Sequence, residues 1–412
     1  MFIEDEGQYD NLKSKYGWTD VEEIRISKTN FVIPGFIDTH IHAPQYSFTG
    51  TGYDLELLDW LKKYTFPSES KLKDQELAKS VYTNLIMNTL QNGTTTACYY
   101  ATIHLESTKL LVDLLYQNGQ RAFVGKVNMD RNGEDYYEEN TNDSLEETKQ
   151  FINYCQSAYE REKGNNPHFV IKPIITPRFV PTCTPTLMSG LGDLAKQYDL
   201  PIQSHISENK GEVLWVSGLH PECKSYAEVY DKHGLLTNKT IMGHAIHLTD
   251  DEIQLFKDRD AGISHCPVSN FALRSGVFPL RKVLKKGVKV GLGTDVSGGY
   301  SISMLEVMRQ AVIASTTISF NDAASEPLSF KEVFYLATLG SAHVAGLGDK
   351  IGSFEVGKYF DALEINPDSG TLFTNLPPIA DTTEDIFQKF IFLGNSLNIA
   401  RVFVQGLTRF IR

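Results

Sequence analysis

The sequence feature that most constrains the fold is an alternation of short β-type runs with segments of helical period. The β-type runs cover residues 36–42, 94–102, 121–129, 169–176, 201–207, 240–247, 262–266 and 288–295. Segments with apolar residues at helical spacing lie between them, for example residues 76–91, 186–198 and 250–258. Strands that alternate with helices form parallel sheets, and a closed (β/α)8 barrel requires eight such units. The alternation therefore predicts an α/β protein built on a TIM-like (β/α)8 barrel.

An open, doubly wound sheet is the other α/β architecture that the alternation allows. That fold commonly binds phosphate at a glycine-rich turn after its first strand. Here the first run is followed by A-P-Q-Y-S-F (residues 43–48), which contains no glycine. The barrel is therefore the favoured fold, and 412 residues are enough for one barrel with an accessory domain.

Charge and the amino-terminal residues indicate the surroundings in which the protein works. The formal net charge is −12, whereas a polyanionic partner needs a basic surface, so we expect no nucleic-acid partner. The sequence begins M-F-I-E-D-E, acidic where a signal peptide is basic, and no apolar stretch is long enough to span a bilayer. The five cysteines are scattered and form no C-x-x-C pair. We expect a soluble, cytoplasmic protein without a membrane partner.

Two histidines end the first β-type run. His40 and His42 are two residues apart, so on a strand both imidazoles point to one side and Ile41 points to the other. At the carboxyl end of a barrel strand, that side is the mouth of the barrel, where active sites form. On its own, however, an H-x-H pair is better explained by two unrelated polar residues.

Three further polar residues lie at the carboxyl ends of other apolar runs. His205 ends P-I-Q-S-H, His244 ends T-I-M-G-H, and Asp295 ends V-G-L-G-T-D. Burying an imidazole or a carboxylate in such a place is costly unless the group has a partner. Five such residues at one barrel mouth suit Zn²⁺, which binds imidazoles and carboxylates and keeps a position open for water in catalytic sites.

One lysine and two histidines near run ends are interpreted as structural residues. Lys172 could bridge two metal ions after carbamylation, but it lies early in its run, so the predicted site holds a single ion. His247 and His265 are each expected to be a hydrogen-bonded structural residue rather than a ligand.

Glu208 follows His205 by three residues, in the segment H-I-S-E. Just beyond a strand end, this spacing places a carboxylate beside the metal without making it a ligand. Such a group can carry a proton between a bound water and a ring nitrogen of a substrate. The alternative, a carboxylate on the surface, is not excluded by the spacing.

Several blocks of the sequence resemble the signatures of a known enzyme family. Four are similar to blocks of the amidohydrolase superfamily: P-G-F-I-D-T-H-I-H (34–42), S-H-I-S-E-N (204–209), M-G-H (242–244) and G-L-G-T-D (291–295). Others are similar to blocks of the animal-type guanine deaminases: A-P-Q-Y-S-F-T-G (43–50), L-L-D-W-L-K-K-Y-T-F-P-S-E (57–69), N-G-T-T-T-A-C-Y-Y-A-T-I-H (92–104), G-Q-R-A-F-V-G-K-V (119–127), I-T-P-R-F (175–179), S-H-C-P-V-S-N (264–270) and V-S-G-G-Y-S-I-S-M-L (296–305). The resemblance extends from about residue 20 to near the carboxyl end.

The resemblance implies a reaction and a set of metal ligands. The reaction is the hydrolysis of guanine to xanthine and ammonia by a zinc-activated water, in a homodimer with one Zn²⁺ per subunit. The implied zinc ligands are His40, His42, His205 and Asp295. The implied catalytic residues are His244, which would orient the attacking hydroxide, Asp295, which would accept the water proton, and Glu208, which would protonate the base.

The resemblance also implies which residues contact the purine. These substrate-binding residues are Gln45, Arg178, Phe179, His205, Glu208 and Asp295. Arginine is the usual bidentate partner of the O6/N7 edge of guanine, which fits Arg178. An aromatic ring such as that of Phe179 can stack on the base. Three more aromatic residues either line this pocket or belong to the core, namely Trp60, Tyr64 and Phe66.

The family has a small β-sandwich beside the barrel, built from both ends of the chain. The predicted domains are residues 1–33 as a remnant of the β-sandwich, residues 34–345 as the barrel, and residues 346–412 as the carboxyl-terminal sandwich strands. Only 39 residues precede His40, fewer than is usual in the family, so the resemblance predicts an N-terminally truncated sandwich with exposed strand edges.

Three segments are predicted to supply strands to this sandwich. Residues 351–365 and 399–405 are typical of β-strands with glycine turns, and residues 21–27 are expected to form a remnant strand.

Two other functions stay open at this point. One is the hydrolysis of another aminoheterocycle, such as a triazine, an adenine derivative or a pterin, by an enzyme of the same superfamily. The other is a non-catalytic scaffold on the same fold, although the sequence keeps every implied metal ligand. Iron is an alternative to zinc, because imidazole and carboxylate ligands suit both metals.

Overall fold

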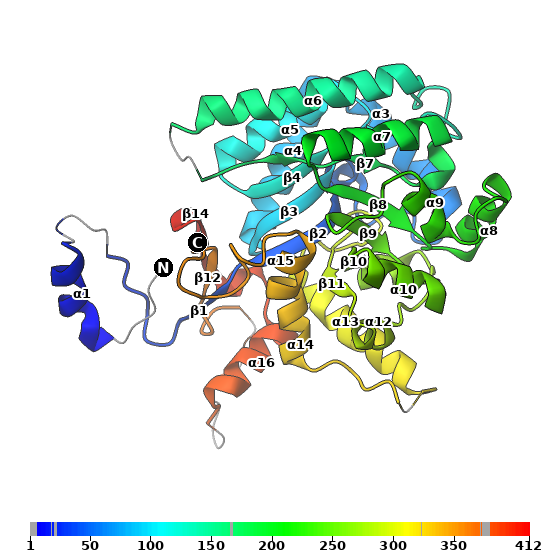
Figure 1. Ribbon diagram of the computed structural model, residues 1–412. Coiled ribbons are helices and arrows are strands. Elements are labelled where there is room, and N and C mark those ends of the chain that lie inside the picture. Colours follow the sequence, from blue (N-terminus) through cyan, green and yellow to red (C-terminus); the bar gives the residue numbers. More distant parts are fainter. Residues whose placement is uncertain are drawn as a thin grey trace.

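A computed structural model of the protein (Figure 1) describes residues 6–17, 19, 23–164, 168–322, 324–370, 372 and 380–412. Parallel strands occupy the centre of the molecule, and most of the helices pack around them (Figure 1). None of the helices within these residues is both long and apolar enough to cross a bilayer.

All eight β-type runs of the sequence contain strands. They are β2 (Phe36–His42), β3 (Thr94–Tyr100), β4 (Arg121–Gly125) with β5 (Val127–Asn128), β6 (Lys172–Pro173) with β7 (Thr176–Pro177), β8 (Ile202–Ile206), β9 (Thr240–His244), β10 (Gly262–His265) and β11 (Lys289–Leu292). The strands pair in parallel in two four-stranded sheets, β2-β3-β4-β6 and β8-β9-β10-β11, and β5 pairs with β7.

The two four-stranded sheets meet at both of their edges. At one edge, Ile175 forms an isolated parallel bridge with Ile202 of β8. At the other edge, the N–H of Asp295, just beyond β11, donates to the carbonyl of His40 in β2 (2.8 Å). These joins are irregular rather than continuous ladders, and the arrangement is the (β/α)8-type barrel that the alternation predicts.

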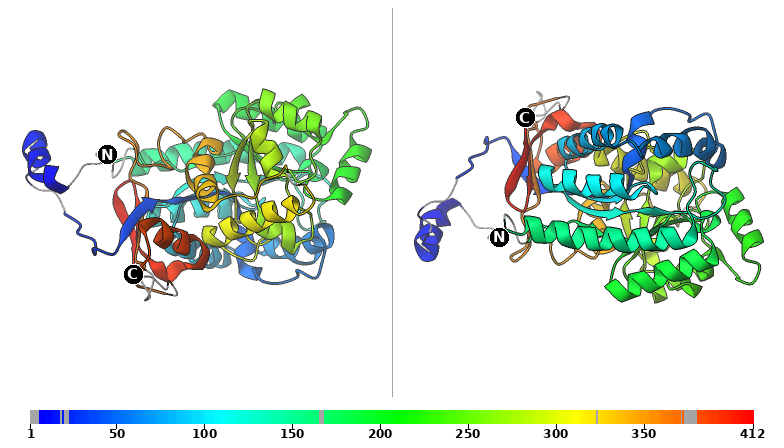
Figure 2. Two further views of the ribbon diagram at one scale, coloured as in Figure 1. Left: turned by 90° about the horizontal axis from the view of Figure 1, so that it is seen from below. Right: turned by 90° about the horizontal axis from the view of Figure 1, so that it is seen from above.

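Helices connect successive strands and cover the outside of the barrel (Figure 2). The helices from α2 to α15 are α2 (Leu57–Trp60), α3 (Phe66–Lys71), α4 (Gln75–Gln91), α5 (Leu105–Asn118), α6 (Thr141–Glu162), α7 (Pro185–Tyr198), α8 (Lys210–Leu219), α9 (Tyr226–Lys232), α10 (Asp250–Asp258), α11 (Pro267–Ala272), α12 (Leu280–Lys285), α13 (Met304–Ser319), α14 (Phe330–Tyr335) and α15 (Ser341–Val344). Helix α1 (Tyr9–Tyr16) lies apart from the barrel (Figure 1).

Helix α7 illustrates how local chemistry sets the ends of these helices. The hydroxyl of Thr184 accepts a hydrogen bond from the N–H of Leu187, and Pro185 occupies the first helical position, where its missing N–H costs nothing. The helix ends at Asp199, which adopts a left-handed conformation (φ 54°). The next strand, β8, can therefore begin only a few residues later.

The end of the barrel opposite to the polar strand ends is filled by apolar side chains. One cluster combines residues of β2, β3, β4 and β9, and Ile174 between β6 and β7, with residues of α15 and the loop after it: Ile37, Cys98, Phe123, Ile174, Ile241, Ala342, Val344, Ala345, Leu347 and Ile351. The polar strand ends lie at the other end of the barrel, where the active sites of such barrels form.

A second, antiparallel sheet lies beside the base of the barrel (Figure 1). Its strands occur in the order β1 (Phe31–Pro34), β12 (Ala362–Ile365), β13 (Ile399–Val404) and β14 (Leu407–Ile411). Helix α16 (Thr383–Leu393) packs on this sheet, with the rings of Phe387 and Phe390 edge-on to Phe31 at 6.5 and 6.1 Å.

The predictions for the sandwich strands are only partly matched. Of residues 351–365, only Ala362–Ile365 form a strand, because Gly352 and Gly357 take positive φ (92° and 94°) and turn the chain before it. A strand was expected at residues 21–27. Residues 23–27 form no strand, and residues 21 and 22 lie outside the described residues. The amino-terminal strand is β1, and α16 was not expected.

A buried ion pair joins the barrel to the second sheet and predicts a loss of stability. Nε and Nη2 of Arg121, the first residue of β4, each donate to the carboxylate of Asp361 over 3.2 Å. The change Asp361→Asn should lower the free energy of unfolding by about 3–5 kcal/mol, because it leaves a buried guanidinium without its counter-charge. Urea unfolding measures the change.

The control is Glu384→Gln, which breaks the exposed pair with Lys331 and should have little effect. Equal unfolding free energies for the two variants would show that the Arg121–Asp361 pair does not hold the sheet to the barrel.

Candidate active site

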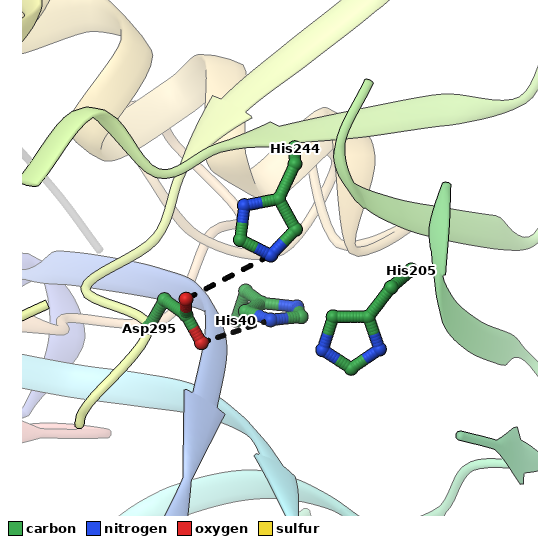
Figure 3. A group of neighbouring side chains, drawn as sticks. All are labelled: His40, His205, His244 and Asp295. Atoms are coloured by element: carbon green, nitrogen blue, oxygen red, sulfur yellow. Dashed lines mark ion pairs between the residues drawn. The ribbon is translucent and has the colours of Figure 1, made fainter. Parts of the chain in front are cut away.

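Five polar side chains meet at the carboxyl ends of the barrel strands. His40 and His42 come from β2, His205 from β8 and His244 from β9, and Asp295 follows β11. Figure 3 shows four of them, His40, His205, His244 and Asp295, with their polar atoms directed toward a common centre. The structure thus brings together all five strand-end residues that the sequence singles out.

Four of these residues have polar atoms at the spacing of ligands around one ion. Nε2 of His40 and Nε2 of His42 each lie 3.3 Å from Oδ1 of Asp295. Nε2 of His42 lies 3.1 Å from Nε2 of His205. Atoms bound tetrahedrally to one zinc ion at about 2.0–2.1 Å lie roughly 3.3 Å from one another. The separations therefore fit a single small divalent cation.

His244 lies on the other side of the Asp295 carboxylate. Its Nε2 is 3.7 Å from Oδ2 of Asp295 and 3.4 Å from Oε2 of Glu208. Its Nδ1 lies 2.9 Å from Oδ1 of Asn270, which can only accept, so Nδ1 carries a proton and donates it. By distance alone His244 is also a candidate ligand, because ligand atoms of His40, His205, His244 and Asp295 all lie within 4.8 Å of one another.

Unpartnered ring nitrogens provide a second indication of a metal site. Nδ1 and Nε2 of His40, Nδ1 of His42 and Nε2 of His244 are buried and have no hydrogen-bond partner within the described part of the chain. Leaving such atoms unsatisfied is costly, and a cation at the centre of the cluster would satisfy the Nε2 atoms. A Cβ on Gly243 or Gly293 would lie 2.7 Å from atoms of His40, so both glycines make room for that ring.

Electrostatics keep the imidazoles in the form that binds metal. Burial lowers the pKa of His42 to about 4 and also lowers the pKa of His40. Burial and the neighbouring imidazoles hold the pKa of His205 well below its ordinary value. Although burial opposes ionisation of Asp295, the adjoining imidazoles of His40 and His42 hold its pKa well below the usual range. Neutral imidazoles and an ionised carboxylate are therefore present at neutral pH.

The backbone at the strand ends is held in strained conformations that aim these side chains. His244 and Asp295 both have left-handed backbone conformations, with φ of 67° and 48°, which residues other than glycine seldom adopt. The carboxylate of Asp38 accepts hydrogen bonds from the N–H groups of His40 (3.1 Å) and Thr294 (3.0 Å) and so ties β2 to the segment that carries Asp295.

Glu208 lies beside the cluster in a buried position. The hydroxyl of Ser275 donates to its Oε1 (3.1 Å), while its Oε2 faces His244. Burial, together with the negative charge of Asp295, raises the pKa of Glu208 well above its ordinary value. The alternative of a surface carboxylate is excluded, because Glu208 is only 3% exposed.

A cavity opens onto the cluster at the mouth of the barrel. The expected purine-binding residues Gln45, Arg178 and Phe179 line it together with His205, Glu208 and Asp295. Apolar side chains of Leu57, Trp60, Leu61 and Leu273 complete the wall. The cavity is therefore apolar on one side and polar on the side of the cluster.

The three aromatic residues left open by the sequence have different positions. Trp60 lines the cavity. Phe66 lies beneath the guanidinium of Arg178, with 5.1 Å between the guanidinium carbon and the ring centroid. Tyr64 stacks with Phe48 at 6.3 Å and is not among the lining residues.

The two histidines interpreted as structural also differ from each other. Nε2 of His247 donates to the carbonyl of Ser275 over 2.9 Å, as expected. His265 is buried against Phe278, and neither ring nitrogen has a hydrogen-bond partner within the described residues. The expectation of a hydrogen bond was wrong for His265, whose burial lowers its pKa to about 3 and keeps the ring neutral.

Three residues of the site were not singled out from the sequence. Asn270 holds His244, Ser275 holds Glu208, and Glu69 of α3 binds both Arg178 and Gln45. None lies at a strand end, which is why the strand-end pattern missed them. Glu69 and Asn270 do, however, close two of the family-like blocks, residues 57–69 and 264–270, and a polar residue in such a block is the signal that could have found them.

Comparison with known families defines the class of protein. Residues 31–408 match the model of the amidohydrolase family. The chain belongs to the amidohydrolase family, whose members are typically metal-dependent, and the His/Asp cluster at the barrel mouth fits that chemistry.

Within that family the chain is similar to guanine deaminases. It is 47% identical to the guanine deaminase of Mus musculus over 411 residues, which cover 98% of this chain and 88% of the relative. The structure of guanine deaminase from C. acetobutylicum with bound guanine in the active site is 42% identical, with a TM-score of 0.87 over 96% of this chain and 90% of that chain. The E. coli guanine deaminase structure is 33% identical, with a TM-score of 0.88 over 98% of this chain and 89% of that chain. These similarities place the chain in the guanine deaminase branch of the family.

The cluster predicts that a divalent metal stabilises the folded protein. Stripping the purified protein with a chelator and then adding Zn²⁺ should raise the thermal midpoint, because binding to the folded state alone contributes about 4 kcal/mol at a thousandfold excess over Kd. Thermal melts at several Zn²⁺ concentrations measure the shift.

Mg²⁺ at the same concentrations is the control, since it prefers oxygen ligands and should restore little. A midpoint that does not respond to any transition metal would contradict a metal site formed by these residues.

Proposed function

We propose that this protein hydrolyses guanine to xanthine and ammonia, using one zinc ion. The observation that carries the proposal is a single cavity lined both by the His/Asp cluster and by Gln45, Arg178 and Phe179. The similarity to enzymes named guanine deaminase, one of them solved with guanine in its active site, supports the same reaction.

In this proposal the zinc ligands are His40, His42, His205 and Asp295. The separations of 3.1–3.3 Å between their ligand atoms support this set. His244 is assigned outside it, because its Nε2 faces Oδ2 of Asp295 and Oε2 of Glu208 rather than Oδ1. The combination of three imidazoles with one carboxylate suits zinc, and metal analysis of the purified protein decides between zinc and iron.

A zinc ion held by these residues would lower the pKa of a water molecule toward about 7 and so supply a nucleophile at neutral pH. Oδ1 of Asp295 belongs to the ligand set, whereas Oδ2 is directed toward His244 and accepts the proton of the attacking water. His244 Nε2 forms a hydrogen bond to the attacking oxygen, and Asn270 keeps its ring in place from the other side.

Glu208 moves protons on the substrate side. Its raised pKa favours the protonated carboxyl group, which gives its proton to the ring nitrogen next to C2 as the water oxygen bonds to C2. Cleavage of the bond from C2 to the exocyclic nitrogen then releases ammonia, which takes up the proton that Asp295 received from the water. The proton left on the water-derived hydroxyl returns to Glu208 as the C2 carbonyl forms. The sum is guanine plus water giving xanthine plus ammonia.

The purine is held by the opposite wall of the cavity. Phe179 stacks on the base, and the ring of Trp215 supports Phe179 from the side (6.3 Å, 82°). Arg178 faces the oxygen-bearing edge of guanine. Nη1 and Nη2 each already donate to Glu69, which leaves each of them one N–H group for a ligand.

The domain limits, the location and the assembly belong to the same proposal. A barrel over residues 34–345, flanked by sandwich segments over 1–33 and 346–412, is supported by the separate sheet formed by β1 and β12–β14. The cytoplasmic location keeps the expectation drawn from the sequence, and the homodimer keeps the one drawn from the family resemblance. Light scattering of the purified protein tests the dimer.

Incubation with guanine tests the proposed function directly. The purified protein should convert guanine to equal amounts of xanthine and ammonia, and a chelator should abolish the reaction until Zn²⁺ is restored. Adenine, a triazine and a pterin serve as competitors, because the other aminoheterocycle hydrolases would prefer one of them. Ammonia release from one of these compounds and not from guanine would indicate a related hydrolase. Protein that holds no metal and releases no ammonia would indicate a scaffold, and either result would contradict the proposal.

Replacement of Glu208 separates binding from turnover. Glu208→Gln keeps the size of the side chain but carries no proton to transfer, so kcat should fall by about a hundred- to ten-thousand-fold while zinc content and guanine affinity change little. Stopped-time xanthine assays and metal analysis measure the two effects.

The matched control is Glu222→Gln, an exposed carboxylate outside the cavity, which should keep wild-type kinetics. Near-normal turnover in Glu208→Gln would exclude Glu208 as the proton carrier.

A further inference from the structure

We infer that Glu69 is a positioning residue for guanine recognition: it fixes the orientation of Arg178 and Gln45 and neutralises the charge of Arg178, so that the cavity selects an uncharged oxopurine. The inference rests on the proposed function, because it assigns Arg178 and Gln45 to the purine. Glu69 itself is not among the residues that line the cavity, so it acts through its neighbours rather than on the substrate.

Glu69 is completely buried and accepts four hydrogen bonds. Arg178 donates two of them, from Nη1 to Oε2 (2.7 Å) and from Nη2 to Oε1 (3.1 Å). Nε2 of Gln45 donates to Oε1 (2.9 Å), and the hydroxyl of Tyr137 donates to Oε2 (2.7 Å). Every neighbour that binds this carboxylate is a hydrogen-bond donor, which favours its ionised form. Burial opposes ionisation, but the charge of Arg178 and its hydrogen bonds outweigh burial and lower the pKa of Glu69.

The contact with Glu69 decides which way the Gln45 amide faces. Nε2 of Gln45 donates to Glu69, and Oε1 of Gln45 accepts from the N–H of Ser297 (3.1 Å). A flipped amide would set an oxygen against the Glu69 carboxylate and an N–H against the N–H of Ser297. Gln45 therefore meets the substrate in one orientation only.

Arg178 is fixed on three sides. Glu69 holds both terminal nitrogens of its guanidinium in the bidentate geometry that restricts this group most strongly, and Phe66 lies beneath the guanidinium plane. Its backbone carbonyl accepts from Nδ1 of His205 over 2.6 Å. One residue thus joins the purine wall of the cavity to the metal cluster, and Glu69 sets the position of its side chain.

Charge is the second consequence of this contact. Arg178 is 2% exposed and Glu69 is 0% exposed, so water does not screen the guanidinium and its counter-charge comes from Glu69. The pair offers N–H groups to a carbonyl oxygen without offering a net positive charge. Guanine is uncharged at neutral pH, whereas xanthine is the stronger acid and is partly anionic, so a neutral wall favours the substrate over the product.

A double-mutant cycle tests this inference, with Glu69→Gln, Arg178→Met and the combined variant. Glu69→Gln should raise KM for guanine by about ten- to one-hundred-fold, the range for losing hydrogen bonds to a charged group, with a much smaller change in kcat. In Glu69→Gln the inhibition constant of xanthine should rise less than the KM for guanine. The Arg178 guanidinium then lacks its counter-charge and attracts anionic xanthine. The combined variant should be no worse than the worse single variant, because both single variants break the same contact.

Conservative variants separate positioning from folding. Glu69→Asp keeps the charge and should recover part of the wild-type KM. The matched control is Glu139→Gln, which removes another nearly buried carboxylate, bonded to Lys126 outside this cavity, and should leave KM for guanine unchanged. If Glu69→Gln does not fold, Tyr137→Phe decides, because it keeps the charge and removes one of the four hydrogen bonds; a severalfold rise in KM supports the inference, and no rise overturns it.

The outcomes distinguish this inference from the proposed function. Wild-type protein that neither deaminates guanine nor binds it in calorimetry overturns both. The positioning role of Glu69 alone is overturned if the wild-type protein deaminates guanine but the variants do not behave as expected. That result would be a KM of Glu69→Gln within about twofold of the wild-type KM, or strictly additive effects in the cycle.

Discussion

The burial of imidazoles and carboxylates at the mouth of the barrel is the constraint on which the rest of the structure depends. Such groups are costly to remove from water unless each has a partner, and here their ligand atoms gather around one centre that a single cation could occupy. Nε2 of His40, in the first strand of the barrel, and Oδ1 of Asp295, just beyond the last strand, lie 3.3 Å apart. The parallel order of the strands makes this contact, because it carries the carboxyl ends of distant segments to one edge.

A second layer of residues holds the reactive groups in position. The contacts are Arg178 carbonyl to His205, Asn270 to His244, Ser275 to Glu208, and Glu69 to Arg178 and Gln45. Each contact leaves one defined face of a side chain directed at the cavity. Groups that are already oriented need no rearrangement when charge develops during the reaction, which is the main source of catalysis in sites of this kind. The left-handed backbones of His244 and Asp295 serve the same purpose.

Most of the barrel and its five strand-end residues could be predicted, since both depend on local rules. All eight β-type runs contain strands, and His40, His42, His205, His244 and Asp295 converge because polar residues at the ends of parallel strands share one edge. The accessory region was predicted less well. Helix α16 depends on how Phe387 and Phe390 pack against Phe31 of β1, and the sequence pattern of the segment does not record that packing.

The sequence by itself determined the α/β alternation and the positions of the candidate ligands, because strand direction and side-chain alternation are properties of neighbouring residues. Only the tertiary structure decided which atom faces which. It directs Oδ1 of Asp295 to His40 and His42 and Oδ2 to His244, and it brings Glu69 of a short helix against Arg178. These pairings join residues far apart in the chain. Their geometry exists only once the barrel encloses them and excludes the water that would otherwise solvate each group.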